Sequence, residues 1–377
     1  MRVVSYDVAL TTRFRGVLRR SGLLLQGEAG WGEWSPFAEY VRPEIDSWWN
    51  AALEAATRPW PAAVRDSVPV NSIVPAVPAE QAARFALAGG CTTAKVKVAE
   101  PGQGLADDLA RVEAVRDALG THGRVRIDAN GAWSVDQAVV ALRELARFGL
   151  EYAEQPCAGV EELAELRLAL ARRGIDVPIA ADESIRRSGD PERVAELEAA
   201  DVAVLKVQPL GGVRRCLRLA ERLGLPVVVS SALETSVGIA AGVALAAALP
   251  ELPYACGLNT LALLAGDVTG DPLVVREGRL PVRRVAPEGT GWQASPELDA
   301  WWRERGAELS GWSSLVSTDH PPGSSPTDRG SGSCGTDRRS SASRPDSGSS
   351  GSRPDSGSSG SRPDSGSSTT PRPEEQP

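Results

Sequence analysis

The alternation of short β-branched runs with amphipathic segments between residues 68 and 258 constrains the fold more than any other feature of this chain. Candidate strands occur at 70–77, 94–98, 125–128, 152–154, 179–182, 202–207, 226–230 and 254–257. Helical periodicity is clearest at 105–119, 135–148, 160–173 and 191–199. Strands that alternate with helices form a parallel sheet, because each helix carries the chain back to the edge where the next strand begins.

Eight such units in succession predict an α/β fold with a closed barrel of the (β/α)8 type, a modified TIM barrel. An open doubly wound sheet is the alternative. A nucleotide-binding sheet of that kind carries a Gly-x-Gly-x-x-Gly loop after its first strand, and no such loop follows residues 70–77. The barrel is therefore the preferred interpretation.

Residues 1–67 have a different pattern and predict an N-terminal α+β capping domain. Its expected parts are two antiparallel strands, a Gly- and Trp-rich loop and a helix, at 2–11, 17–26, 27–37 and 45–57. The barrel domain is expected over residues 68–315. Its last segment, after residue 258, completes the final barrel helix and returns to cover the capping domain.

The C-terminal segment, residues 316–377, is composed almost entirely of Ser, Gly, Pro, Asp and Arg. It repeats a nine-residue unit that begins Ser-Arg-Pro-Asp-Ser-Gly-Ser-Ser at Ser343, Ser352 and Ser361. Such a composition buries too little apolar surface to offset the conformational entropy lost on folding. We expect a disordered tail.

Composition excludes several classes of function. The net charge of −8 disfavours nucleic-acid binding, and no apolar run approaches the roughly 20 residues that cross a bilayer. The two histidines lie at positions 122 and 320, which disfavours histidine triads and multi-histidine metal sites. The five cysteines lack CxxC spacing, and residues 1–5 resemble a strand rather than a leader peptide. A cytoplasmic protein without an evident protein partner is expected.

Lysine is almost absent from the chain. Of 41 basic residues only Lys95, Lys97 and Lys206 are lysines, and lysine, unlike arginine, can release its proton. Lys95 and Lys97 share one face of a strand, so their mutual repulsion favours one neutral amine. Lys206 lies four strands later, on the opposite side of an eight-stranded ring. Random survivors of codon bias are the alternative, but the arrangement suits abstraction of a proton α to a carboxylate.

Three acids follow successive strands at intervals of about one βα unit: Asp128, Glu154 and Asp182. Their carboxylates would converge at the C-terminal edge of the barrel and repel one another. A divalent cation relieves this repulsion, and an all-oxygen ligand set favours Mg²⁺, with Mn²⁺ as a second possibility. The alternative is that each acid separately caps the helix that follows it.

The order of these motifs resembles the muconate-lactonizing subgroup of the enolase superfamily. The motifs are Lys-x-Lys, Asp-x-Asn, Glu-Gln-Pro, Asp-Glu-Ser and Lys-x-Gln-Pro, at 95–97, 128–130, 154–156, 182–184 and 206–209. Segments 30–37, 70–75 and 230–238 add to the resemblance, which covers residues 1 to about 310. It implies a small-molecule carboxylate substrate, a barrel with an N-terminal cap and a hydro-lyase that dehydrates a cyclohexadiene carboxylate.

The resemblance also implies roles for individual residues. Lys97 would abstract the α-proton and then assist loss of the hydroxyl group, Lys206 would stabilise the enediolate, and Lys95 would tune Lys97. Metal ligands would be Asp128, Glu154 and Asp182. Residues that orient those ligands would be Asn130, Gln155 and Glu183. Contacts with the succinyl arm of the substrate would come from Ser230, Ser231 and Gly257, although a strand end without ligand contact explains these three equally well.

Two alternative functions remain open at this point. An N-acylamino acid racemase or a muconate cycloisomerase would use the same site, because two lysines on opposite faces also suit racemisation. A non-catalytic barrel with a structural metal is the other alternative, and the presence of Lys97 and Lys206 argues against it.

Overall fold

The structure is a computed structural model that describes residues 1–187 and 191–316. The N-terminal part is a three-stranded antiparallel sheet in the order β1-β2-β3 with one helix packed on it. Its elements are β1 (Arg2–Phe14), β2 (Val17–Gly27), β3 (Gly30–Trp34) and α1 (Glu44–Thr57). The predicted disordered tail lies outside the described residues except for Val316.

The loop predicted at 27–37 is wrong in part, because residues 30–34 form β3. The glycines of this segment favoured the prediction of a loop, but Gly32 lies in a strand and allows α1 to pack closely against it. A Cβ atom at Gly32 would lie 2.0 Å from the carbonyl oxygen of Ala52 in α1. The strand is glycine-rich because the helix backbone lies directly against it.

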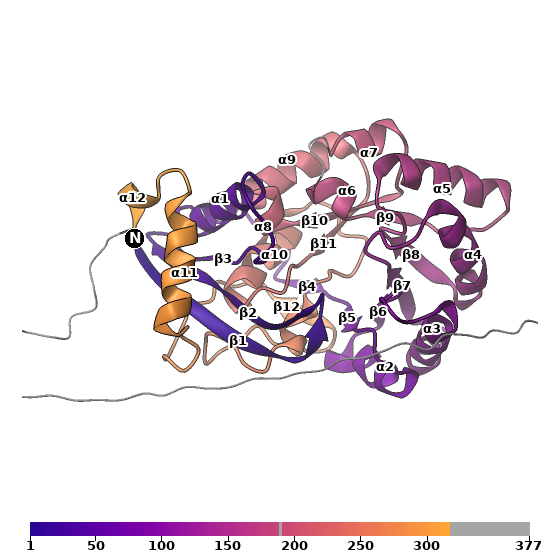
Figure 1. Cartoon of the computed structure of the whole chain (residues 1–377), viewed down its shortest axis with the longest axis horizontal. Helices are drawn as coiled ribbons and strands as arrows, with labels where there is room; N and C mark the ends of the chain where they lie inside the picture. The colour runs from indigo at the N-terminus through magenta and orange to yellow at the C-terminus, as the bar shows by residue number, and fades with distance from the viewer. Residues whose placement is uncertain (188–190, 317–377) are drawn as a thin grey trace, which may run out of the picture. The chain divides into compact units, whose positions relative to one another are not determined.

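The central sheet contains seven parallel strands in the order β11-β10-β9-β8-β7-β6-β5, ringed by helices (Figure 1). They are β5 (Ser72–Val74), β6 (Thr93–Lys97), β7 (Arg124–Asp128), β8 (Leu150–Glu154), β9 (Ile179–Ala181), β10 (Val202–Lys206) and β11 (Val227–Ser230). The predicted fold class, a modified (β/α)8 barrel with an N-terminal cap, is confirmed.

The eighth strand predicted at 254–257 is only a short extended stretch. Cys256 N–H donates to Pro69 O at 2.7 Å, and Gly257 N–H donates to Val229 O at 2.8 Å. Isolated parallel bridges join this stretch to Val70 and Ser230. These few bonds to both edges of the seven-stranded sheet complete the ring.

The helices around the barrel alternate with its strands, as the periodicity predicts. They are α2 (Ala79–Ala86), α3 (Leu105–Leu119), α4 (Val135–Leu145), α5 (Val160–Arg172), α6 (Glu183–Arg186), α7 (Arg193–Glu196), α8 (Val207–Leu210), α9 (Val213–Leu223) and α10 (Ser236–Ala248). Short 3-10 turns occur at Ala88–Gly90, Ala146–Phe148 and Asn259–Leu263. The helix predicted at 191–199 is reduced to the single turn α7, since Glu198 has a φ of 49° that a helix cannot continue through.

Helix α10 was not expected from amphipathic periodicity, because it is apolar on every side. It contacts α9 and β11 of the barrel, and β3 of the cap, so nearly every residue along it is buried. A helix covered on all faces carries no amphipathic signal.

The chain returns to the cap after the barrel. Strand β12 (Arg279–Pro281) pairs with β4 (Ser67–Pro69), and α11 (Pro296–Ala307) and α12 (Trp312–Leu315) follow. Trp302 of α11 packs edge-on against Trp34 of β3, with ring centroids 5.4 Å apart. Within the described residues, no helix combines the length and apolar character needed to span a membrane. The predicted domain limits at residues 67 and 315 stay predictions.

Candidate active site

The chemistry-bearing residues lie at the C-terminal ends of the barrel strands. Lys97 ends β6, Asp128 ends β7 and Glu154 ends β8, and these three are successive partners in the register of the sheet. Asp182 directly follows β9, and Lys206 ends β10. Because β6 and β10 are separated by three strands, Lys97 and Lys206 approach the centre from opposite sides of the ring.

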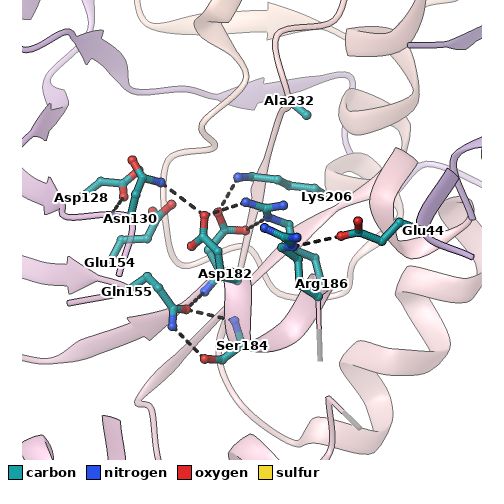
Figure 2. Close-up of polar contacts among 12 residues, drawn as sticks. Glu44, Asp128, Asn130, Glu154, Gln155, Asp182, Ser184, Arg186, Lys206 and Ala232 are labelled. Carbon is teal, nitrogen blue, oxygen red and sulfur yellow. Dashed lines mark hydrogen bonds and ion pairs between the residues drawn. The ribbon is translucent and has the colours of Figure 1, made fainter. Parts of the chain in front are cut away.

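Each carboxylate of the trio contacts a lysine. Lys95 Nζ donates to both oxygens of Glu154 at 2.7 and 2.8 Å and lies 3.4 Å from Asp128 Oδ2. Lys97 Nζ donates to Asp128 Oδ2 at 2.6 Å. Lys206 Nζ donates to Asp182 Oδ2 at 2.6 Å, as Figure 2 shows. Lys206 also interacts electrostatically with Asp128 and Glu154, so the three acids and three lysines form one cluster, in which only Lys97 is half-buried.

Asn130 and Glu183 join the ends of two strands that are not adjacent. Lys97 Nζ donates to Asn130 Oδ1 at 2.5 Å, and Asn130 Nδ2 donates to Glu183 Oε1 at 3.3 Å. Asn130 has a φ of 48°, in the left-handed region that is uncommon outside glycine. This backbone conformation directs its side chain to the amine of Lys97.

Gln155 ties the end of β8 to the loop after β9. Its Oε1 accepts from the backbone N–H groups of Asp182 and Ser184 at 2.9 and 3.1 Å, and its Nε2 donates to Ser184 Oγ at 2.7 Å (Figure 2). The side chain therefore fixes the backbone that carries Asp182. Gln155 also has a positive φ, 40°, and strained residues of this kind cluster at functional sites.

Arg186 belongs to the cluster and was not predicted from the sequence. Its Nε donates to Asp182 Oδ1 at 3.1 Å, its Nη2 to Glu183 Oε1 at 2.6 Å and its Nη1 to the hydroxyl of Tyr40 at 3.0 Å. The available signal was its position four residues after Asp182, one helical turn away. In a chain so rich in arginine, that signal did not stand out.

Burial and charge move the pKa values of the cluster apart. Burial lowers the pKa of Lys97, and the ammonium of Lys95 adds to this effect while Asp128 opposes it. Burial would raise the pKa of Asp128, but Lys97 and Lys95 outweigh it and hold that pKa well below its usual range. Of the two lysines on β6, Lys97 is therefore the one that releases its proton more readily, because its pKa is lowered while that of Lys95 is raised.

Of the three acids, only Glu154 has a raised pKa. Burial raises its pKa to about 7, and although Lys95 opposes this, repulsion from Asp128 and Asp182 adds to it. A second sign of unmet charge is the Oε2 atom of Glu183, which is buried without a hydrogen-bond partner. Both observations fit a site that accepts additional positive charge.

The donor chemistry fits a hard divalent cation, because the three side chains offer only carboxylate oxygens. In the part of the chain that the structure describes, no three acidic, histidine or cysteine side chains already converge on one point. The lysine contacts explain this, since each carboxylate turns toward an amine. The three acids fit a metal by their oxygen donors and their burial, and not by a common point of approach in this structure.

A narrow cavity of about 30 Å³ lies above the cluster, room for about one water molecule. A substrate the size of a benzene ring therefore fits only if side chains that line this cavity move. The lining includes the predicted Ser230, Ser231 and Gly257. It also includes residues that sequence reasoning missed: Phe14, Ile73, Ala232, Leu233 and Thr260.

The predicted serine contacts are partly engaged within the protein. Ser231 Oγ donates to Gly257 O at 2.7 Å and lies 3.0 Å from Thr260 Oγ1. Phe14, at the tip of the β1–β2 hairpin, has its ring centroid 5.4 Å from Lys97 Nζ. This contact brings the tip of the cap directly to the amine of Lys97.

Comparison with known proteins defines the class. The chain matches the family model described as "Enolase N-terminal domain-like" over residues 4–56 and "Enolase C-terminal domain-like" over residues 78–298. Muconate lactonizing enzyme from Pseudomonas fluorescens is similar in fold, with a TM-score of 0.63 at 22% identity over 80% of this chain and 97% of that one. The L-Ala-D/L-Glu epimerase of Bacillus subtilis has a TM-score of 0.63 at 24% identity, over 78% and 98%. The resemblance to the enolase superfamily is confirmed.

Curated relatives narrow the class. o-Succinylbenzoate synthase of Thermobifida fusca is 63% identical over 82% of this chain and 97% of the relative. The protein of the same name from Mycolicibacterium smegmatis is 55% identical over 78% and 91%, respectively. The chain belongs to the o-succinylbenzoate synthase family of the enolase superfamily.

Proposed function

We propose that this chain dehydrates 2-succinyl-6-hydroxy-2,4-cyclohexadiene-1-carboxylate to o-succinylbenzoate, a hydro-lyase step of menaquinone biosynthesis. The relatives of that name support the reaction. The observation that carries it is the pairing of Lys97 and Lys206, which approach one carboxylate cluster from opposite sides of the barrel.

In this proposal Lys97 is the base. Its neutral amine removes the proton from C1, the carbon α to the ring carboxylate. The resulting ammonium then donates that proton to the hydroxyl group leaving C6, so that water is lost and the ring becomes aromatic. The lowered pKa of Lys97 supports this role, because a general base must be neutral before the reaction.

Lys206 and Lys95 have electrostatic roles in this proposal. Lys206, which forms an ion pair with Asp182, acts as the cation that stabilises the negative charge developing when the α-proton leaves. Burial alone would lower the pKa of Lys95, but Glu154 and Asp128 outweigh it and raise that pKa. Lys95 is then the charged neighbour whose repulsion adds to the effect of burial and lowers the pKa of Lys97 further.

The proposed metal is Mg²⁺, or Mn²⁺ in its place, held by Asp128, Glu154 and Asp182. When bound, it supplies positive charge to the substrate carboxylate and so makes the α-proton more acidic. Three residues orient the proposed ligands: the backbone N–H of Asn130 donates to Asp128 Oδ1 at 3.1 Å, and Gln155 holds the backbone of Asp182. Glu183 acts through Arg186, which donates to both Glu183 and Asp182. Ser230, Ser231 and Gly257 are the proposed contacts of the succinyl arm.

A second activity, N-acylamino acid racemase, shares the observation that two lysines face one another. Racemisation requires a second amine able to exchange a proton, whereas dehydration requires Lys206 only as a cation. Muconate cycloisomerase chemistry and a non-catalytic barrel are less favoured. The cytoplasmic location and the independence from nucleic acid, membrane and protein partners stay predictions.

The experiment that tests the proposal supplies the purified chain with the dehydration substrate and Mg²⁺, and in parallel with N-acylamino acids. Formation of o-succinylbenzoate, followed by its ultraviolet absorbance, is the expected result. Racemisation without dehydration would overturn the proposed reaction in favour of the second activity.

A further inference from the structure

We propose that Arg20, a residue of the cap, positions the wall of the substrate cavity by holding the loop between β11 and α10. This inference rests on the proposed function for its kinetic readout. Ala232 and Leu233 of this loop line the cavity. Their backbone carbonyls accept hydrogen bonds from the cap rather than from the barrel. Arg20 lies in β2 and contacts no reacting group, so its role is to position the loop.

Arg20 is buried, only 3% exposed, and its guanidinium donates to neutral acceptors. Its Nε donates to Leu233 O at 3.1 Å, and its Nη2 donates to Ala232 O at 3.3 Å and to Ser35 O at 2.5 Å. The guanidinium also lies over the ring of Phe37, 4.4 Å from the centroid. Glu33 and Glu234 interact electrostatically with this buried charge, but it donates hydrogen bonds to the carbonyls of the loop, so the side chain fixes the loop geometry.

The loop itself needs external support. Leu233 has a φ of 64°, a left-handed conformation that costs a non-glycine residue free energy and persists only where surrounding contacts enforce it. The carbonyl of this strained residue is the one that accepts from Arg20 Nε. The cap therefore stabilises a backbone conformation of Leu233 that is unfavourable for a residue other than glycine.

A second residue of the cap secures the other end of the same loop. Glu33 of β3 accepts from Thr235 Oγ1 at 2.5 Å and from the backbone N–H groups of Thr235 and Gly238 at 3.1 and 3.0 Å. These donors lie at the start of α10, where a carboxylate also satisfies the helix dipole. With α10 anchored by Glu33, the bond from Arg20 determines how residues 232 and 233 face the cavity.

The test compares Arg20→Lys with the matched control Arg19→Lys, whose side chain is 57% exposed and pairs with Asp7. Loss of charge-assisted bonds to the loop should raise KM for the dehydration substrate by about tenfold or more in Arg20→Lys. We expect kcat to change by less than about threefold, and Mn²⁺ affinity, measured by electron paramagnetic resonance, to stay unchanged. The reason is that Arg20 forms no hydrogen bond with the three lysines or with the three proposed metal ligands. Arg19→Lys should match the wild type throughout.

A milder variant keeps the proposal testable if Arg20→Lys does not fold. Ser35→Ala removes one acceptor of Arg20, Ser35 Oγ at 3.1 Å, and should raise KM by a few-fold with the same unchanged Mn²⁺ affinity. Wild-type KM in a folded Arg20 variant, or in Ser35→Ala where the Arg20 variant is unfolded, would overturn the positioning role. A wild-type chain that does not dehydrate the substrate would instead refute the proposed function, so the two failures are distinguishable.

Discussion

Lys206 and Asp182 form a buried ion pair at the ends of neighbouring strands, with Nζ donating to Oδ2 at 2.6 Å. The other oxygen of Asp182 accepts from Arg186. Burial would raise the pKa of Asp182, but Arg186 and Lys206 outweigh it and hold that pKa well below its usual range. The lowered pKa favours the anionic form of Asp182, as the proposed role of a metal ligand requires.

The first prediction concerns this ligand. Asp182→Asn should weaken Mn²⁺ binding at least tenfold, because an amide oxygen replaces one of three anionic ligands. Mn²⁺ titration followed by electron paramagnetic resonance measures the change. Asp117→Asn, at an exposed position of α3, is the matched control and should bind as the wild type does. Equal affinity in Asp182→Asn and the control would remove Asp182 from the ligand set. In a separate assay of the wild type, EDTA should abolish turnover and added Mg²⁺ should restore it.

The second prediction tests the electrostatic role proposed for Lys206. Lys206→Ala should lower kcat by about 100-fold or more, because a preorganised cation opposite the developing charge is lost. Stopped-time assays of o-succinylbenzoate formation measure this, with Mn²⁺ affinity as the check that the acids stay intact. A kcat within twofold of wild type would show that Lys206 has no electrostatic role.

The third prediction concerns stability and pH. Burial, with repulsion from Glu33 as a second cause, raises the pKa of Glu234 from 4.5 to about 7. An acid whose pKa is raised on folding holds its proton more tightly in the folded state than in the unfolded state. Its stabilising effect is therefore complete below pH 4.5 and is lost as pH rises toward 7.

Glu234→Gln should remove this dependence, since glutamine keeps an acceptor for the backbone N–H of Ala232 but does not ionise. The wild type should lose on the order of 2–3 kcal/mol more than the variant between about pH 5 and pH 7.5. Urea unfolding at the two pH values measures the difference. Glu251→Gln, an exposed control, should behave as the wild type. Parallel pH dependence in wild type and Glu234→Gln would contradict the assignment.

The fourth prediction concerns the tail that the sequence predicts at residues 316–377, of which the structure describes only Val316. Truncation after Val316 should leave kcat and KM of the dehydration within about twofold of the full chain, because every proposed site residue precedes it. Steady-state kinetics of the two proteins decide the point. A large drop in kcat/KM would mean that the tail contributes to the site.

The sequence was most informative where chemistry and spacing coincide. Asp128 and Glu154 could be placed at adjacent strand ends, because parallel strands present equivalent ends at one edge of a sheet. Lys97 could be placed on the same layer by the period-two alternation of strand side chains. These residues needed no knowledge of the packing around them.

Features that depend on packing could not be predicted in this way. Gly32 resembled a turn residue until the approach of α1 explained it. Helix α10 lacked periodicity because both the barrel and the cap cover it. Arg186 and Arg20 were two arginines among many, and only their contacts distinguish them. Such residues are defined by their neighbours across the fold.

The most direct test of the account is the dehydration rate of Lys97→Arg beside that of the wild type. Arginine keeps the positive charge and the reach to Asp128 but does not release its proton, so it cannot serve as a base. The account predicts that the wild type forms o-succinylbenzoate, and that the variant loses at least about 1,000-fold in kcat while Mn²⁺ affinity is retained. A variant that turns over at a rate near that of the wild type would contradict the assignment of Lys97 as the base, and with it the central claim.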